Sequence, residues 1–195
     1  HSLFLQALDD VKALANNTIN TDEAIDLIKT FSSTWFSLQS YDEQKYPKPK
    51  NDSKVDISID KLYKNLSELK SNLINKGEAT PLFAQEKYKD SLESIVNNVM
   101  QEDFGEKMYP SVEEKSAHLL YFVVKNHPFN DGNKRSGAFA FIWFLNEIGY
   151  QHKISPETLT TLTILIAESS PKDKDRMIGM ILLLLIDQNL TTTYN

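Results

Sequence analysis

The sequence predicts an all-α fold, and three observations support this prediction. Apolar residues recur at three- and four-residue spacing along most of the 195 residues, which is the period of an amphipathic helix. Patterns that start helices, in which Ser or Thr precedes acidic residues or proline, occur repeatedly. The alternation typical of half-buried strands is nearly missing, and only the stretch 98–110 suggests a short hairpin.

The first two predicted helices lie within residues 1–54. Apolar residues at helical spacing run from Leu3 to Ala15, and Thr21 caps a second helix that reaches about Leu38. The stretch that follows is polar and contains two prolines, so it cannot continue a helix. We therefore assign 1–54 to an N-terminal helical extension and 55–195 to the main domain.

The sequence of the main domain predicts a further series of helices with clear start and stop signals. Gly77 ends a helix that begins near Ile57, and Ser111 with Glu114 forms a capping box. Ser-Pro pairs at 155–156 and 170–171 start the last two helices, with proline at the first helical position. The expected helices cover about 57–76, 86–98, 112–126 and 132–148, followed by those that start at 156 and 171.

Composition excludes several classes of function. The net charge of −6 argues against a duplex DNA or RNA binder, so no nucleic-acid partner is expected. The chain has no Cys, which excludes disulfides and cysteine chemistry. Its longest apolar run, 177–186, is too short to span a membrane, and the N-terminal apolar residues lack the basic start of a signal peptide. We therefore expect a cytoplasmic protein without membrane contact, with secretion as an effector left open.

The residues that carry chemistry lie at 127–135, in the sequence HPFNDGNKR between two apolar helices. Pro128 ends the preceding helix and leaves His127 at its C-terminal edge, where an imidazole can accept a proton near neutral pH. Phe129 is apolar among polar neighbours, so we expect it to be buried and to anchor the loop to the core.

The turn after Phe129 has the composition of an anion site. Unpaired N–H groups at a helix N-terminus carry partial positive charge, and Gly132 lets the backbone approach a phosphate closely. Lys134 and Arg135 place positive charge at the positive end of the helix dipole, which is unfavourable for helix stability. Their presence therefore indicates an anionic ligand. Asp131 supplies a hard oxygen for a Mg²⁺ that also binds phosphates.

The sequence HPFNDGNKR resembles the signature of the Fic/Doc family, His-x-Phe-x-Asp/Glu-Gly/Ala-Asn-x-Arg, at every specified position. The flanking stretches MYPSVEEKSAHLLYFVVKNHPF and SGAFAFIWFLNEIGY are similar to the helices on either side of this motif in the family. The resemblance extends over about 85–150. It implies a Fic-type helical bundle with a short β-hairpin flap next to the active-site loop, here at 98–110.

The resemblance also implies an enzyme that uses ATP and Mg²⁺ to modify a protein hydroxyl. His127 would be the general base that deprotonates a target Ser, Thr or Tyr, and Asp131 would hold Mg²⁺. Phe129 would anchor the loop. The residues that would bind the nucleotide phosphates are Gly132, Asn133, Lys134 and Arg135.

Two departures from the family pattern bear on the reaction. Members that transfer AMP commonly have Gly before the motif's Arg and a second Arg three residues after it, whereas this sequence has Lys134 and Ala138. The Doc branch, which transfers the terminal phosphate, shares both departures. Transfer of AMP (AMPylation) is the main hypothesis. The alternatives are a Doc-like protein kinase acting as the toxin of a toxin–antitoxin pair, a non-catalytic Fic-fold interaction module, and another reaction at the same site, such as choline-phosphate transfer or nucleotide hydrolysis.

The resemblance further implies two kinds of partner. A target protein would bind the flap at about 98–110 by adding a strand to it. The inhibitory motif Ser/Thr-x-x-x-Glu-Gly/Asn of many Fic enzymes is missing from the sequence, as is the Arg that its Glu would engage. Any inhibition would therefore come from a separate antitoxin chain or from a region N-terminal to this sequence.

Overall fold

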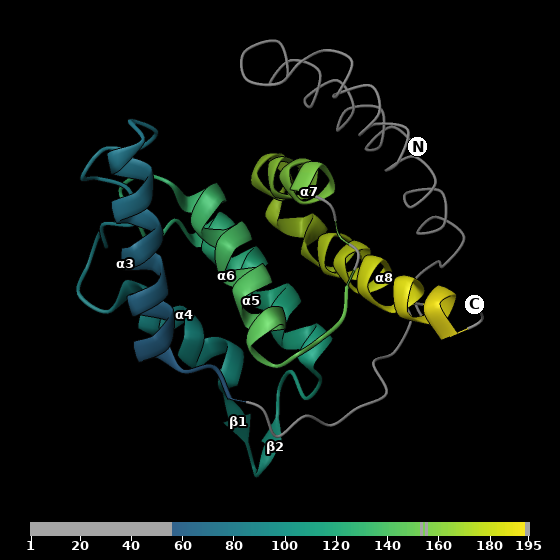
Figure 1. Ribbon diagram of the computed structural model, residues 1–195. Helices are drawn as coiled ribbons and strands as arrows, with labels where there is room; N and C mark the ends of the chain where they lie inside the picture. The colour runs from purple at the N-terminus through teal and green to yellow at the C-terminus, as the bar shows by residue number, and fades with distance from the viewer. Residues whose placement is uncertain (1–55, 153, 155, 194–195) are drawn as a thin grey trace. The chain divides into compact units, whose positions relative to one another are not determined.

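The computed structural model describes residues 56–152, 154 and 156–193 (Figure 1). The two helices predicted within 1–54, and the predicted boundary at residue 54, lie outside the described residues. The chain divides into two compact units, and the unit that contains the 127–135 motif spans Pro49–Gln151. We refer to it as the motif unit.

The motif unit is a helical bundle with one small hairpin, so the mostly helical prediction is confirmed. Helix α5 packs along α6, α4 packs against α5, and α3 packs against α6 (Figure 1). The elements in chain order are α3 (Ile59–Asn75), α4 (Ser91–Met100), β1 (Glu102–Asp103), β2 (Glu106–Lys107), α5 (Val112–Asn126) and α6 (Asn133–Glu147).

Apolar faces of these helices form the core of the motif unit, as their helical spacing predicts. The close contact between α5 and α6 depends on Gly137, because a Cβ atom there would lie 2.9 Å from the Cγ2 atom of Val124. Buried core residues contributed by the helices and the motif loop include Leu62, Leu66, Leu92, Ile95, Val96, Val99, Leu119, Val123, Phe129 and Phe144.

Helix α5 starts as the sequence predicts. The hydroxyl of Ser111 accepts the N–H of Glu114 at 3.0 Å and donates to the Glu114 carboxylate at 3.1 Å. This pairing satisfies one of the N–H groups that every helix start leaves without a helical partner. Helix α5 then runs to Asn126, so its predicted bounds are confirmed.

Helix α4 begins later than the sequence predicts, at Ser91 and not at about residue 86. Ala84 and Asp90 have positive φ angles of 52° and 62°, which a helix cannot contain. The side chain of Asp90 does not cap the helix. Instead the Glu86 carboxylate accepts the N–H of Leu92 at 3.1 Å and the hydroxyl of Ser91 at 3.2 Å, so an upstream residue performs the capping.

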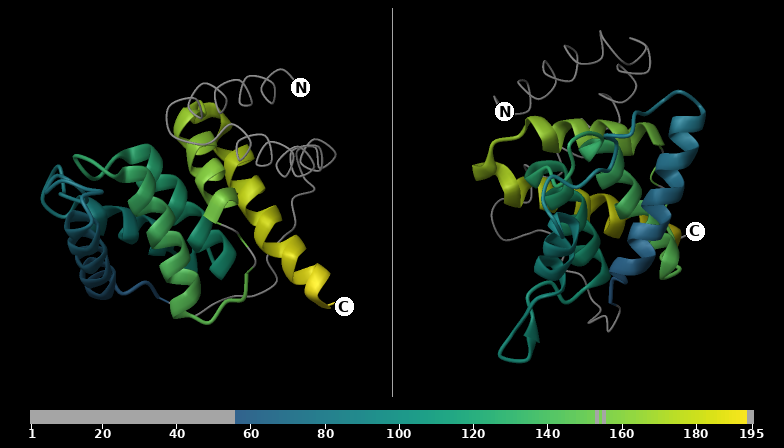
Figure 2. Two further views of the ribbon diagram at one scale, coloured as in Figure 1. Left: turned by 45° about the horizontal axis from the view of Figure 1, so that its top comes forward. Right: turned by 90° about the vertical axis from the view of Figure 1, so that its left-hand side faces the viewer.

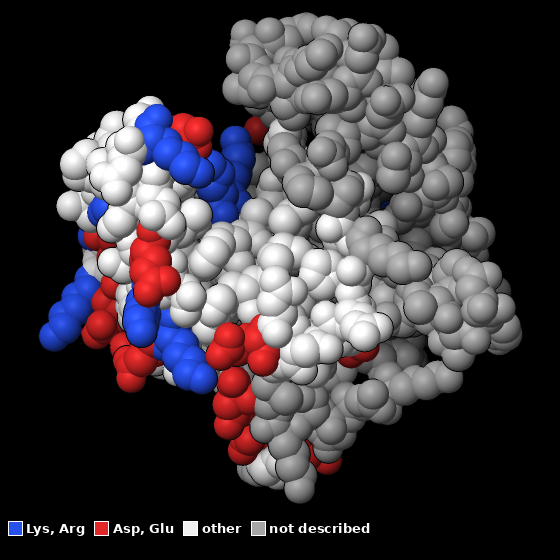
Figure 3. All heavy atoms as spheres, in the orientation of Figure 1, with Lys and Arg blue, Asp and Glu red and all other residues white. Residues whose placement is uncertain are grey.

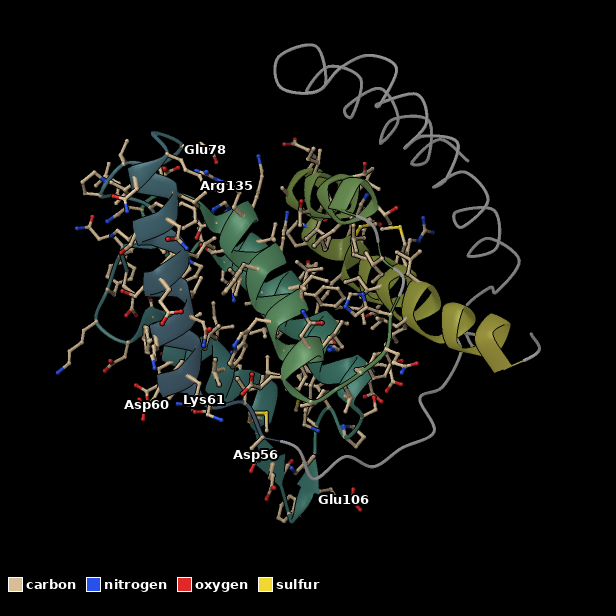
Figure 4. The ribbon with its side chains drawn as sticks, in the orientation of Figure 1. Asp56, Asp60, Lys61, Glu78, Glu106 and Arg135 are labelled. Atoms are coloured by element: carbon tan, nitrogen blue, oxygen red, sulfur yellow. The ribbon has the colours of Figure 1, made fainter. Side chains whose placement is uncertain are left out.

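The hairpin lies next to the N-terminal end of α5, whereas the motif loop follows its C-terminal end. The predicted position of the hairpin, as a flap beside the motif loop, is therefore wrong. The 15 residues of α5 that separate the hairpin from the motif loop span about 22 Å. Figure 2 shows the hairpin projecting from the motif unit, and Figure 4 places Glu106 and Arg135 at opposite ends of it. Segment 83–87 occupies the position beside the motif loop, as described below.

The described part of the second unit contains α7 (Pro156–Glu168), the short 3-10 helix η1 (Pro171–Asp173) and α8 (Lys174–Thr193). The starts predicted at residues 156 and 171 are confirmed, although the second begins with a 3-10 turn. Among the described helices, none combines the length and the apolar character that crossing a membrane requires.

Candidate active site

The motif loop, residues 127–132, connects α5 to α6 with left-handed backbone at both ends. His127 is the C-cap of α5 with φ 50° and ψ 61°, and Gly132 is the N-cap of α6 with φ 79°. A non-glycine residue in this conformation is uncommon and costs free energy, so the position of His127 is not explained by helix stability. The two left-handed residues turn the chain from one helix into the next.

Phe129 and Asn133 fix the inside of the motif loop. The Phe129 side chain is 1% exposed and belongs to the core. The Asn133 amide accepts the N–H of Phe129 and donates to its carbonyl, both at 2.9 Å. The amide is thus held through its oxygen and one of its two N–H groups, which fixes the Asn133 side chain against the backbone of Phe129.

Segment 83–87 holds the outside of the motif loop. It forms one parallel bridge, between Phe83 and Asp131, and one antiparallel bridge, between Glu86 and Phe129. The backbone hydrogen bonds run from Ala84 N–H to Asp131 at 3.0 Å, from Asn130 N–H to Gln85 at 2.8 Å and from Lys87 N–H to Pro128 at 2.9 Å. The loop is thus clamped between its own buried Phe129 and a segment more than 40 residues earlier in the chain.

His127 is exposed at the edge of the loop, and its pKa is lowered from the ordinary value. Burial of part of the ring is the first cause, because desolvation disfavours the imidazolium. The positive charges of Lys87, Lys125 and Lys134 lower the pKa further. The imidazole is therefore neutral at pH 7 and able to accept a proton.

Arg135 extends from the first turn of α6 towards segment 78–83. Its Nη1 atom donates to the carbonyl of Glu78 at 2.9 Å, and its guanidinium carbon lies 4.7 Å from the centre of the Phe83 ring. Figure 4 shows Glu78 and Arg135 together at this end of the unit, and Figure 3 shows Lys and Arg side chains gathered there. Lys134 beside it is also exposed, so cations surround the start of α6.

Asp131 is exposed at the turn that leads into α6, and its backbone carbonyl is the atom that binds segment 83–87. Its carboxylate is thus left to face solvent, and a hard oxygen ligand of this kind fits Mg²⁺. Within the described residues, no group of three or more His, Asp or Glu side chains could hold a metal ion by itself. A Mg²⁺ at Asp131 would need further oxygens from phosphates and water, as Mg²⁺ commonly has.

In a comparison with protein families, the model of the Fic/DOC family matches residues 58–145. This segment contains α3, α4, the hairpin, α5, the motif loop and α6 as far as residue 145. No curated protein matches the chain, and no solved structure does. The family resemblance that the sequence indicates is therefore confirmed, whereas the particular reaction is not defined by it.

Segment 83–87 was not predicted to be part of the site. The helix of α4 was predicted to begin at about residue 86, within this segment. Two signals were present: Pro81 interrupts any helix upstream, and Phe83 is an apolar residue between polar and turn-forming neighbours. Those signals predict a loop with one buried aromatic side chain, but they do not show what that side chain contacts.

Proposed function

We propose that the motif unit transfers AMP from ATP to a Ser, Thr or Tyr hydroxyl of a protein. The Fic/DOC family domain supports a transferase. The observation that carries the proposal is the arrangement of the motif loop. A neutral His127 lies at one end of this six-residue loop, and the glycine N-cap of α6 lies at the other end. Cations lie near both ends of the loop. A proton acceptor and an anion site thus lie together.

In the proposed reaction, His127 accepts the proton of the target hydroxyl. The hydroxyl oxygen forms a bond to the α-phosphorus of ATP, and the bond between that phosphorus and the pyrophosphate breaks. His127 then carries the proton, and its lowered pKa favours release of that proton to solvent. Bound Mg²⁺ would neutralise phosphate charge in this step.

The phosphates would lie on the N-terminus of α6. There the backbone N–H groups after Gly132 are without helical partners, so they can donate to phosphate oxygens. Arg135 retains guanidinium N–H groups beyond the one that Glu78 accepts, and Lys134 adds a second charge. The Asn133 amide is held by Phe129, and we assign the backbone N–H of Asn133 to the phosphates.

Transfer of the γ-phosphate is the second candidate, because of Lys134 and Ala138. Lys134 adds a cation in the first turn of α6, while Ala138, one turn further, provides no donor. With the donors concentrated at the first turn, the nucleotide could bind with its terminal phosphate towards His127. The target oxygen would then attack the γ-phosphorus, and ADP would leave.

The hairpin remains the proposed strand-addition surface, at about 98–110. Since about 22 Å of helix separates it from the motif, a bound target segment would need about seven extended residues to reach His127. We therefore propose that the hairpin docks a part of the target distant from the modified hydroxyl. An antitoxin chain would inhibit by covering the cationic end of the unit.

Labelled ATP distinguishes these reactions. The chain is incubated with Mg²⁺, host lysate and ATP labelled at the α- or the γ-phosphate, with the His127→Asn variant as control. Label from α-ATP in a protein, dependent on His127, supports AMP transfer, and label from γ-ATP alone supports the kinase. If Mg²⁺-ATP binds but neither label is transferred, both reactions are wrong, and the interaction module or another donor is favoured.

A further inference from the structure

We infer that Phe83 is a positioning residue that holds Gly132 and Arg135 in place for the phosphates of the nucleotide. The inference rests on the proposed function, since it assumes a phosphate ligand at the start of α6. Phe83 is fully buried, although it belongs to the connection between α3 and α4. Its ring contacts the motif turn and also lies under the guanidinium of Arg135.

The first contact fixes the anion-binding turn. A Cβ atom added to Gly132 would overlap the Cδ2 atom of Phe83 and lie 2.5 Å from its Cε2 atom. The ring therefore packs directly against the Gly132 backbone, with no room for a side chain. This packing, together with the φ of 79°, explains why the position needs glycine.

The second contact fixes Arg135. The guanidinium carbon lies 4.7 Å from the centre of the Phe83 ring, within the range of a cation–π interaction. The carbonyl of Glu78 accepts one of its N–H groups at 2.9 Å. Phe83 and Glu78, both in the connection between α3 and α4, thus hold one face and one N–H group of the guanidinium. Its other N–H groups can point at phosphate oxygens.

The backbone of Phe83 is fixed independently of its ring. Phe83 forms a parallel bridge with Asp131, and the N–H of the next residue, Ala84, donates to the Asp131 carbonyl at 3.0 Å. A substitution that changes only the ring should therefore leave segment 83–87 paired with the motif loop. Phe83 acts through Gly132 and Arg135, while His127, at the other end of the loop, keeps its role in proton transfer.

The test compares Mg²⁺-ATP affinity, measured by calorimetry, between matched variants. Phe83→Leu removes the aromatic face and keeps an apolar side chain, and we expect it to weaken affinity about three- to tenfold. Phe144→Leu is the control, since Phe144 is 1% exposed on the same helix as Arg135 but nine residues further on. It should lower Tm to a similar extent without changing affinity.

A double-mutant cycle with Arg135→Gln tests whether Phe83 affects Mg²⁺-ATP affinity through Arg135. If Phe83 acts largely through Arg135, Phe83→Leu should weaken affinity much less in the Arg135→Gln background than in the wild type. In the transfer assay, KM for ATP should rise while kcat and the pH profile stay unchanged. A structural role alone would lower Tm and leave both KM and the coupling unaffected.

Two different results would overturn different claims. Unchanged affinity in Phe83→Leu, or fully additive losses in the cycle, would overturn the inference while wild-type binding of Mg²⁺-ATP keeps the proposed function. Failure of the wild-type chain to bind Mg²⁺-ATP would overturn the proposed function itself. If Phe83→Leu does not fold, Phe83→Met replaces it, because an unbranched side chain adapts to the same space.

Discussion

The two ends of α5 differ in what their residues contribute. At the N-terminal end, the hydroxyl of Ser111 pairs with both the N–H and the carboxylate of Glu114. The buried ammonium of Lys115 donates to the carbonyl of Pro110 at 2.9 Å. Each of these contacts satisfies a polar group that would otherwise cost free energy, so stability accounts for this end.

The C-terminal end has the opposite character. His127 adopts a left-handed backbone, and Gly132 starts α6 without a side-chain cap. Lys134 and Arg135 place positive charge at the positive end of the α6 dipole. Stability alone does not explain these features, whereas an anionic ligand would. The contacts at the N-terminal end of α5 are thus explained by stability, whereas the features of the motif end agree with the proposed function.

The largest effect should come from His127. His127→Asn should reduce transfer about 10²–10⁴-fold, the usual contribution of a general base, because Asn cannot accept the proton. Asn tolerates left-handed backbone, so Tm and Mg²⁺-ATP affinity should stay close to those of the wild type. Transfer is followed with labelled ATP and binding by calorimetry. A variant as active as the wild type would show that another group is the base.

Phe129 in the motif loop and Phe104 at the hairpin tip differ in burial, so truncating them should have different effects on stability. Phe129→Ala should lower the free energy of unfolding by about 3–5 kcal/mol, since Phe129 is 1% exposed in the core. Phe104→Ala at the hairpin tip should change it by less than about 0.5 kcal/mol, because that side chain is 100% exposed. Urea unfolding measures both. Equal losses at the two positions would mean that the loop is not anchored as described.

The cap at the N-terminal end of α5 can be removed without changing the motif loop. Ser111→Ala removes the hydroxyl that accepts the Glu114 N–H, and it should cost about 1 kcal/mol in urea unfolding. Affinity for Mg²⁺-ATP should not change, because the cap lies a helix length from the motif. A loss of affinity without a loss of stability would contradict the division of roles between the two ends.

The smallest effect concerns the charge near His127. Lys87→Gln removes one of the cations that lower the pKa of His127, so this pKa should rise towards its ordinary value. Transfer requires the neutral imidazole, and the acid limb of the pH–rate profile should therefore move to higher pH. The control Lys64→Gln makes the same charge change on α3, at a lysine other than the three that lower the pKa of His127.

The shift caused by Lys87→Gln should shrink in 1 M salt, where the screening length falls to about 3 Å. A shift in the opposite direction, or equal shifts in the Lys87 and Lys64 variants, would contradict the electrostatic explanation.

Much of the helical framework of the motif unit could be predicted from the sequence. The capping box at Ser111 and Glu114 and the bounds of α5 are local features, decided by residues within a turn of one another. The start of α4 could not be predicted, because Glu86 caps it through a loop that includes left-handed Asp90. The hairpin was predicted, but its distance from the motif loop follows from helix packing.

The helical periods, the locally capped start of α5 and the motif at 127–135 can be read from the sequence, because each depends on neighbours along the chain. The surroundings of the motif depend instead on how the helices pack. Gln85 is 45 residues from its partner Asn130, and Glu78 is 57 residues from Arg135. No local pattern specifies such pairs, since they form only when α3, α4, α5 and α6 pack together and bring segment 83–87 against the loop.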